Sequence, residues 1–217
     1  VLLTVASGAY STPLAWTDLL RWNILQLIGV GYFVAMCVFL LRRGAQVAFV
    51  VVVLLGKWAL MALTPWEAVE PVVSGRLAEG APLGPGTWAH HDAIKSYVNQ
   101  VPWLGMAQQF LPCGAIAVLG GWTTEMLTAQ RSTGGKAVRV FGFGAGLTAV
   151  AYLLQWGYDP AGDGLFGRYT VPFSKWTFSP AYCLLASGTG ALLLLAFWWV
   201  IDVARWTSAW PLRVYGL

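Results

Sequence analysis

The stretch "CLLASGTGALLLLAFWWVIDV" (residues 183–203) decides the fold class. It holds a single charged residue, Asp202, close to its end. A helix of about 20 apolar residues, at about 1.5 Å per residue, spans the roughly 30 Å hydrocarbon core of a bilayer. We therefore predict that this stretch crosses a membrane as an α-helix.

The stretch directly before it, "FSKWTFSPAY" (residues 173–182), is polar and aromatic. Ser179 and Pro180 fit the N-cap and first positions of a helix, and Trp176 fits the aromatic belt at a membrane interface. Alternatively, Trp176 could stack on a sugar ring and Lys175 could bind an anionic group. We predict capping and anchoring here, and keep open that the same residues form one wall of a substrate site.

The composition of the whole chain supports the membrane interpretation. Of its 217 residues, 58% are hydrophobic and 10% are charged, whereas a soluble domain carries about 25% charged residues. So few charges cannot cover a water-facing surface. The sequence therefore predicts an all-α, polytopic transmembrane helix bundle with the lipid bilayer as its partner. The net charge of +4 is explained by membrane topology, so we expect no nucleic acid.

The apolar runs predict about five complete spans, with partial helices at both ends, in a single transmembrane domain over residues 1–217. The expected spans are residues 18–41, 45–64, 104–128, 137–157 and 179–204. Residues 1–10 resemble the end of a helix and residues 211–217 the start of another. We therefore expect the chain to be an internal fragment of a longer protein.

Basic residues gather on one side of this expected bundle. They are Arg42, Arg43, Arg131, Lys136, Arg139, Arg205 and Arg213. The positive-inside rule makes that side cytoplasmic. The long connections over residues 65–102 and 159–178 then face the periplasm or the outside. Connections of this length tend to be functional, so we expect any chemistry to be approached from the external face.

The most polar external cluster is "HHDAIKSYVNQ" (residues 90–100). His90 and His91 are the only histidines, and histidine is the natural general base near neutral pH. Asp92 could orient one of them, and Lys95 could hold an anion. The alternative is a solvated loop with a helix beginning at Asp92.

The sequence predicts neither a metal site nor a disulfide. The cysteines Cys37, Cys113 and Cys183 all fall inside apolar runs. A structural zinc site needs four ligands and a catalytic one needs three. The loop that holds His90 and His91 offers no further ligand at a suitable spacing.

Several polar residues fall inside the expected spans, where they are costly unless paired or hydrated. They are Asn23, Gln26, Lys57, Gln108, Gln109, Glu125 and Asp202. Lys57 lies past the middle of its span, so it either pairs with a carboxylate or lines a polar cavity. Glu125 and Asp202 lie near cytoplasmic ends, where hydration lowers the cost. Gln26 suits a hydrogen bond between helices or a ligand contact.

Small residues predict close helix packing in the last two spans. In "GFGAG", Gly142 and Gly146 are four residues apart, and Ala186 and Gly190 repeat the spacing in "ASGTG". Small residues at this spacing let helices approach closely. We favour packing over phosphate binding for both pairs.

Three stretches carry a resemblance to a known family. They are "RWNILQLIGVGYFVA" (residues 21–35), "FLPCGAIAVLGGWTTEML" (residues 110–127) and "VPFSKWTFSPAYCLLASGTGALLLLAFWWVIDVARW" (residues 171–206). They resemble segments of the heparan-alpha-glucosaminide N-acetyltransferase family and its bacterial membrane acyltransferase relatives. The last stretch is the most specific, and "PLRVYGL" resembles the start of the next family helix. One departure is Leu27 after Gln26, where many relatives have Arg.

This resemblance implies an integral membrane enzyme, here of the bacterial inner membrane. Such enzymes move an acetyl group from acetyl-CoA to an amino sugar on the non-cytoplasmic side. The family's proposed catalytic histidine belongs to an early external loop, which would precede Val1. The catalytic residue is therefore unknown in this chain, and His90, His91 and Asp92 remain candidates from the residues alone.

The remaining candidate residues are assigned either to binding of the acceptor or to binding of the acetyl donor. Substrate-binding candidates are Gln26, Asn99, Lys175, Trp176 and Ser179. Arg42 and Arg139 could hold the phosphates of acetyl-CoA, with a small molecule or glycan as the acceptor. A transporter or flippase of a sugar-linked or acylated substrate, and a purely structural subunit, are the alternatives. We leave open a homodimer.

Overall fold

The structure is a computed structural model that describes residues 24–64, 102–156, 170, 172–175 and 177–204. Every regular element in these ranges is a helix, which confirms the all-α prediction. The elements are α3 (Ile24–Phe39), α4 (Arg43–Leu63), α7 (Pro102–Thr128), α8 (Thr133–Gln155), α9 (Pro180–Trp198) and a π-helical turn, η2 (Trp199–Val203). The expected partial helices at residues 1–10 and 211–217 lie outside the described residues.

Each predicted span corresponds to one helix. The first span is predicted from residue 18, and residues 18–23 lie outside the described residues. Helix α9 ends at Trp198 and continues as η2 to Val203, close to the predicted end at residue 204. Helix α8 begins at Thr133 rather than at residue 137. Its beginning is set by Ser132, whose hydroxyl accepts a hydrogen bond from the backbone N–H of Gly135 at 3.3 Å. The prediction missed this N-cap because the residues after it, "TGGK" (133–136), resemble a loop.

Four of the helices are long and apolar enough to cross a membrane. These segments are Arg43–Ala62, Ala107–Thr128, Thr133–Gln155 and Pro180–Val203, and Leu27–Phe39 is a shorter apolar helix. Large apolar side chains such as Phe33, Val52 and Leu193 are exposed on the outside of the described bundle. This is the architecture of an integral membrane protein, because lipid rather than water suits such a surface.

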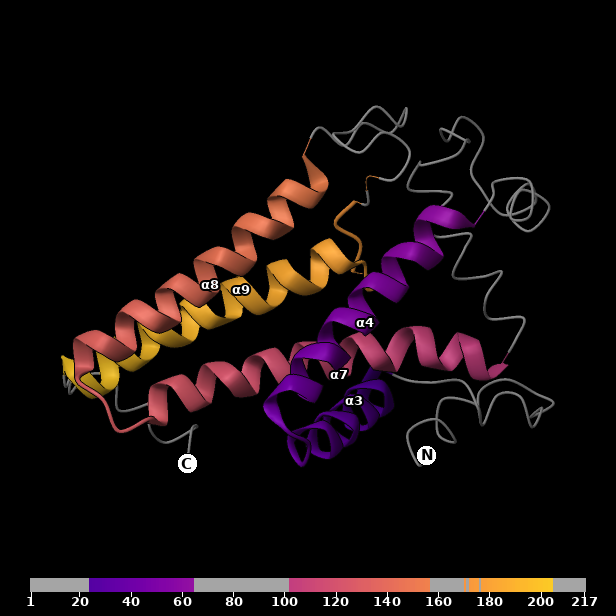
Figure 1. Cartoon of the computed structure of the whole chain (residues 1–217). Helices are drawn as coiled ribbons and strands as arrows, with labels where there is room; N and C mark the ends of the chain where they lie inside the picture. Colours follow the sequence, from indigo (N-terminus) through magenta and orange to yellow (C-terminus); the bar gives the residue numbers. More distant parts are fainter. Residues whose placement is uncertain (1–23, 65–101, 157–169, 171, 176, 205–217) are drawn as a thin grey trace, which may run out of the picture.

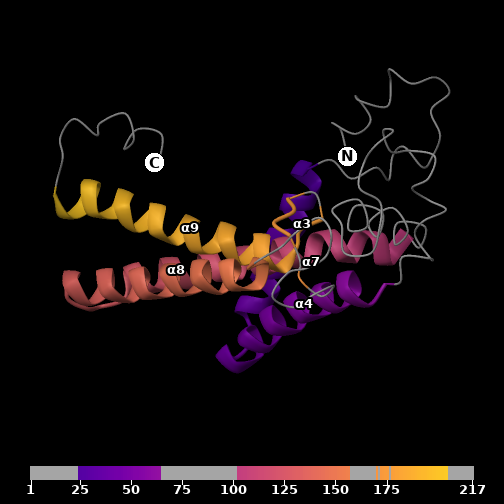
Figure 2. The same ribbon diagram turned by 90° about the horizontal axis from the view of Figure 1, so that it is seen from above.

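Helix α7 lies at the centre of the described bundle and contacts α3, α4, α8 and α9. Figures 1 and 2 show α8 and α9 side by side, and Figure 2 shows α3 and α4 on opposite sides of α7. The core lies where these helices meet. It joins Val38 of α3 and Val50 of α4 to Val118 and Trp122 of α7 and Leu184 of α9.

Helices α4 and α7 run in opposite directions. The start of α4 contacts the end of α7 through Arg43 and Glu125, whereas Lys57, further along α4, contacts Gln108 near the start of α7. We call the end of the bundle that holds the turns over residues 40–42 and 129–132 the basic end. The opposite end, where α4 and α8 end and α7 and α9 begin, is the loop end. The helix ends that flank both long connections are thus at the loop end (Figure 1). Most of both connections lies outside the described residues, so their place on one face stays a prediction.

The close approach of α8 and α9 is real, but the sequence prediction named the wrong glycines. A side-chain carbon added at Gly188 would lie 2.7 Å from the carbonyl oxygen of Gly144, whereas Gly142, Gly146 and Gly190 have open space around them. Residues two apart on a helix point in widely different directions, since successive residues are about 100° apart. The "GFGAG" and "ASGTG" motifs therefore do bring the helices together, through a face that the prediction did not select.

Candidate functional site

A buried lysine joins α4 to α7 within the apolar part of the bundle. The ammonium of Lys57 donates a hydrogen bond to Oε1 of Gln108 at 3.0 Å. Lys57 is 5% exposed and Gln108 is 6% exposed. A lysine at the centre of a transmembrane helix costs about 2.5–3.5 kcal/mol on insertion, and Lys57 lies between the centre and the end of the Arg43–Ala62 span. Intramembrane ionisable residues of this kind mark functional sites by default.

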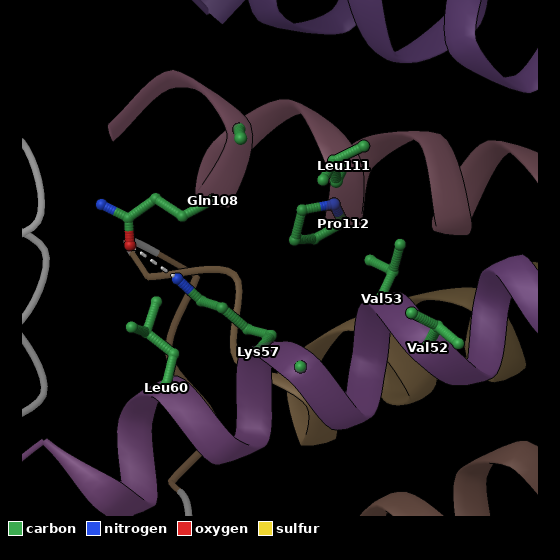
Figure 3. Close-up of a pocket in the computed structure, with 9 residues that line it drawn as sticks. Val52, Val53, Lys57, Leu60, Gln108, Leu111 and Pro112 are labelled. Atoms are coloured by element: carbon green, nitrogen blue, oxygen red, sulfur yellow. Dashed lines mark hydrogen bonds between the residues drawn. The ribbon is translucent and has the colours of Figure 1, made fainter. Parts of the chain in front are cut away.

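The Lys57–Gln108 pair lies at one end of a groove between the two helices. We call it the Lys57 groove, and its volume is about 260 Å³. It is lined by Val52, Val53, Gly56, Lys57, Leu60, Ala107, Gln108, Leu111 and Pro112. Figure 3 shows Lys57 and Gln108 reaching toward each other at one end, with Leu111, Pro112, Val52 and Val53 at the other. Among the described residues, Lys57 donates to the amide of Gln108, and the rest of the groove lining is apolar. The predicted carboxylate partner stays a prediction.

Proline 112 shapes the α7 wall of the groove. It lies inside the helix and its side chain is fully buried. A proline has no N–H, so residue 112 cannot make the helical hydrogen bond to the carbonyl of Gln108. The α7 wall therefore lacks one regular helical hydrogen bond at the level of the Lys57–Gln108 pair.

A second polar cluster ties the same two helices at the basic end. Arg43 forms an ion pair with Glu125, with 2.6 Å between Nη2 and Oε2, and its guanidinium lies 4.9 Å from the ring centre of Trp122. Oε1 of Gln46 accepts from Arg43 Nη1 at 3.0 Å and from Trp122 Nε1 at 2.9 Å. We call Arg43, Gln46, Trp122 and Glu125 the basic-end cluster.

Gln46 also connects this cluster to the end of α3. Its Nε2 donates to the backbone carbonyls of Leu41 at 3.1 Å and Phe39 at 3.4 Å. These carbonyls belong to the turn where α3 ends, and helix ends leave such groups without intrahelical partners. The cluster therefore holds three helix ends in place, which is a structural role.

The segment before α9 forms a hydrogen-bonded turn at the loop end. The hydroxyl of Ser179 accepts from the backbone N–H groups of Ser174 at 3.1 Å and Tyr182 at 3.2 Å, with Pro180 at the first turn of the helix. The predicted N-cap is confirmed. Phe178 adopts a positive φ of 49°, and the buried hydroxyl of Thr177 has no hydrogen-bond partner. Strained backbone of this kind is often found near functional sites.

The predicted substrate residues are only partly described. Lys175 is exposed beside this turn, and Ser179 is fully buried in it. Gln26 lies in the first turn of α3 as described. His90, His91, Asp92, Asn99 and Trp176 lie outside the described residues. Their roles in catalysis or substrate binding stay predictions.

The predicted acetyl-CoA residues lie at or toward the basic end. Arg42 is exposed in the turn before α4, and Arg139 is exposed about two turns into α8. Asp202 is exposed in η2 at the same end. A role for Arg42 and Arg139 in holding phosphates stays a prediction.

Sequence reasoning missed two members of the basic-end cluster, Gln46 and Trp122. Gln46 is three residues after Arg43, and Trp122 is three residues before Glu125. Residues at this spacing share a helix face. Searching the faces of the two charged residues for polar neighbours would therefore have identified both.

In comparisons with known proteins, no family model matches the chain, and no curated protein or solved structure is significantly similar to it. The function must therefore be argued from the sequence and from the geometry of the described residues.

Proposed function

We propose that this integral membrane protein is an acyltransferase of the heparan-alpha-glucosaminide N-acetyltransferase type. It transfers an acetyl group from acetyl-CoA to an amino sugar or related glycan on the non-cytoplasmic side. The observation that carries the proposal is the buried Lys57–Gln108 pair, which lies toward the loop end beside an apolar groove. The resemblance of residues 21–35, 110–127 and 171–206 to this family supports it.

The groove provides the anchoring chemistry that such a transfer needs. The Lys57 ammonium attracts oxygen-rich or anionic groups of the acceptor, and it does so in an environment of low dielectric where charge interactions are strong. The reaction itself forms a bond from the acceptor nitrogen to the acetyl carbonyl carbon and breaks the carbon–sulfur bond of the thioester. The amine proton passes through a general base to the departing thiolate. Lys57 positions the acceptor for this step, and a histidine of the kind that this family uses serves as the base.

The other predicted residues take complementary roles in this proposal. Lys175, Trp176 and Ser179 belong to the segment that leads into α9 at the loop end, and form the acceptor wall with Gln26 and Asn99. Arg42 and Arg139 contact the phosphates of acetyl-CoA from the basic side. A transporter would need a polar path across the bilayer. The Lys57 groove is otherwise apolar, so we favour acyl transfer.

Radiolabelled acetyl transfer tests the proposal. The full-length protein is reconstituted in lipid nanodiscs, where both faces are accessible, and incubated with labelled acetyl-CoA and glucosamine-bearing acceptors. We expect label in the acceptor with the wild type and the control Arg131→Met, and little label with Lys57→Met. Arg131 is exposed in the turn between α7 and α8, so its variant removes one positive charge far from the groove. No transfer by the wild type to any acceptor would overturn the proposal.

A further inference from the structure

Helix α7 is packed differently on the two sides of Pro112. The residues of α7 that belong to the buried core run from Ala115 to Trp122, so all of them follow this proline. Before it, α7 forms one wall of the Lys57 groove of about 260 Å³. Packed interiors have few voids larger than a water molecule. Residues 102–111, which we call the loop-end arm of α7, therefore have space beside them into which they can move.

Directly after Pro112, α7 is held against α3 by close backbone contact. A side-chain carbon added at Gly31 of α3 would lie 2.8 Å from Cβ of Cys113 and 3.3 Å from the backbone nitrogen of Gly114. One added at Gly114 would lie 3.0 Å from Cγ1 of Val34. Small residues at a crossing let helices approach closely. This crossing fixes the rest of α7 at a point next to the proline.

Pro112 is also where α7 bends most easily. A proline has no N–H, and its ring crowds the carbonyl four residues earlier, which in α7 belongs to Gln108. Sharp kinks, of more than about 20°, occur in helices at such prolines. The arm begins at Pro102, about 15 Å along the helix axis from Pro112. A change of about 20° in the kink angle would therefore move its beginning by about 5 Å.

The hydrogen bond between Lys57 and Gln108 is compatible with such a movement. Gln108 lies only about 6 Å along the axis from Pro112, so the same change in angle moves it by about 2 Å. The ammonium of Lys57 is carried on a flexible four-carbon chain, which can follow its partner over this distance. The 3.0 Å contact thus limits the movement of the arm without preventing it.

We infer that the loop-end arm of α7 pivots at Pro112, and that its movement toward α4 closes the Lys57 groove. The arm carries Ala107, Gln108 and Leu111 of the groove wall, so α4 and α7 approach each other as it moves. The bundle then opens and closes at the loop end while its core and the basic-end cluster stay in place. The inference does not depend on the proposed function, because hinges of this kind control access to many sorts of binding site.

Disulfide trapping in nanodiscs tests the hinge. The full-length protein, with its three cysteines replaced by alanine, carries Leu60→Cys and Ala107→Cys on opposite walls of the groove and is oxidised with copper phenanthroline. We expect a cross-link, because closure brings these two positions together. We expect it to form about fivefold more slowly with Pro112→Ala, which restores the helical hydrogen bond and stiffens α7.

A second cysteine pair shows that each variant is folded. Val34→Cys and Gly114→Cys lie at the crossing of α3 and α7, where Cβ of Val34 is 3.3 Å from a carbon added at Gly114. This is close to the separation of about 3.5–4.5 Å between the Cβ atoms of a disulfide. The crossing pair should cross-link at the same rate with Pro112 and with Pro112→Ala, because the hinge leaves this crossing in place.

Gly56→Phe gives an independent readout, which still applies if Pro112→Ala fails to fold. A carbon added at Gly56 meets no atom within 4 Å, so phenylalanine fits there and occupies the space that the arm would enter. It should slow the groove cross-link by about fivefold, whereas Gly142→Phe, at another helix glycine with open space around it, should not. A groove cross-link that never forms while the crossing pair does would overturn the inference. A groove cross-link that forms equally fast with Pro112→Ala or with Gly56→Phe would overturn it as well.

Discussion

Helices α4 and α7 are held together by polar contacts at two levels, and the two contacts differ in kind. At the basic end, Arg43, Gln46, Trp122 and Glu125 bond to one another, and the two charged side chains are 52% and 51% exposed. Toward the loop end, Lys57 meets Gln108 in the buried interior beside a groove.

Under the proposed function, the difference separates a structural contact from a functional one. The basic-end cluster lies where water or lipid head groups reach it, so its charged side chains stay solvated and their desolvation cost is small. Its hydrogen bonds hold the helix ends in place. Lys57 carries its charge in the hydrocarbon region, where a charge lowers stability. Under the proposed function, binding of the acceptor offsets this cost. The expected effects below therefore divide into stability at the basic end and activity at the groove.

The largest expected effect on stability comes from replacing Trp122, the large aromatic side chain of the basic-end cluster. Trp122 is a buried member of the core, and Trp122→Ala should lower the free energy of unfolding by about 3–5 kcal/mol. Unfolding in mixed detergent micelles measures this. Trp156→Ala, at the exposed end of α8, should change it by less than about 1 kcal/mol. Equal losses in both variants would show that Trp122 has no special place in the core.

The next effect falls on activity rather than on stability. Lys57→Met should lower kcat/KM for acetyl transfer by about 10- to 150-fold, mainly through KM, because a hydrogen bond to a charged group contributes about 1.5–3 kcal/mol. The free energy of unfolding should change little, because removing a buried charge offsets the loss of the hydrogen bond to Gln108. Steady-state kinetics together with micelle unfolding measures both quantities. A fall in stability with an unchanged KM would make Lys57 a structural residue and remove the contrast between the two regions.

The fold could be predicted from the sequence because one physical rule dominates it. Runs of about 20 apolar residues must form helices in lipid, so each expected span matched a described helix, and the Ser179 N-cap was predicted from its side-chain chemistry. The glycine prediction was wrong because spacing alone does not say which face of a helix meets its neighbour. That depends on the crossing of α8 and α9, where Gly144 meets Gly188.

The groove could be predicted only in part. Lys57 stood out because a charge within an apolar run is rare, and Gln108 stood out as a polar residue in another span. Nothing in the sequence pairs them, since they are 51 residues apart and meet only because α4 and α7 are antiparallel. The roles of Gly56 and Pro112 as walls depend on the same arrangement. Apolar and small residues at such positions look like any other part of a transmembrane helix.

A smaller effect is expected at the hydrogen-bonding centre of the basic-end cluster. Gln46→Leu removes the acceptor of the Trp122 indole N–H and the donor to the Leu41 carbonyl. Leaving a buried donor without a partner costs about 1–3 kcal/mol. Thermal and denaturant unfolding in micelles measure the loss, and Gln130→Leu in the exposed turn after α7 is the control. A variant as stable as the wild type would mean that water replaces these bonds, and that the cluster does not hold the helix ends.

The smallest effect is expected for the ion pair itself. Arg43 and Glu125 lie 2.6 Å apart but are each about half exposed, and exposed ion pairs contribute about 0.2–1 kcal/mol. A double-mutant cycle with Arg43→Met and Glu125→Gln isolates this coupling from the contacts of Arg43 with Gln46 and Trp122. The coupling should weaken as salt is raised from 0.1 M to 1 M, because the Debye length falls from about 10 Å to about 3 Å. A coupling above about 2 kcal/mol that salt does not change would mean that this pair is as shielded from water as Lys57. The basic-end cluster would then need a functional explanation of its own.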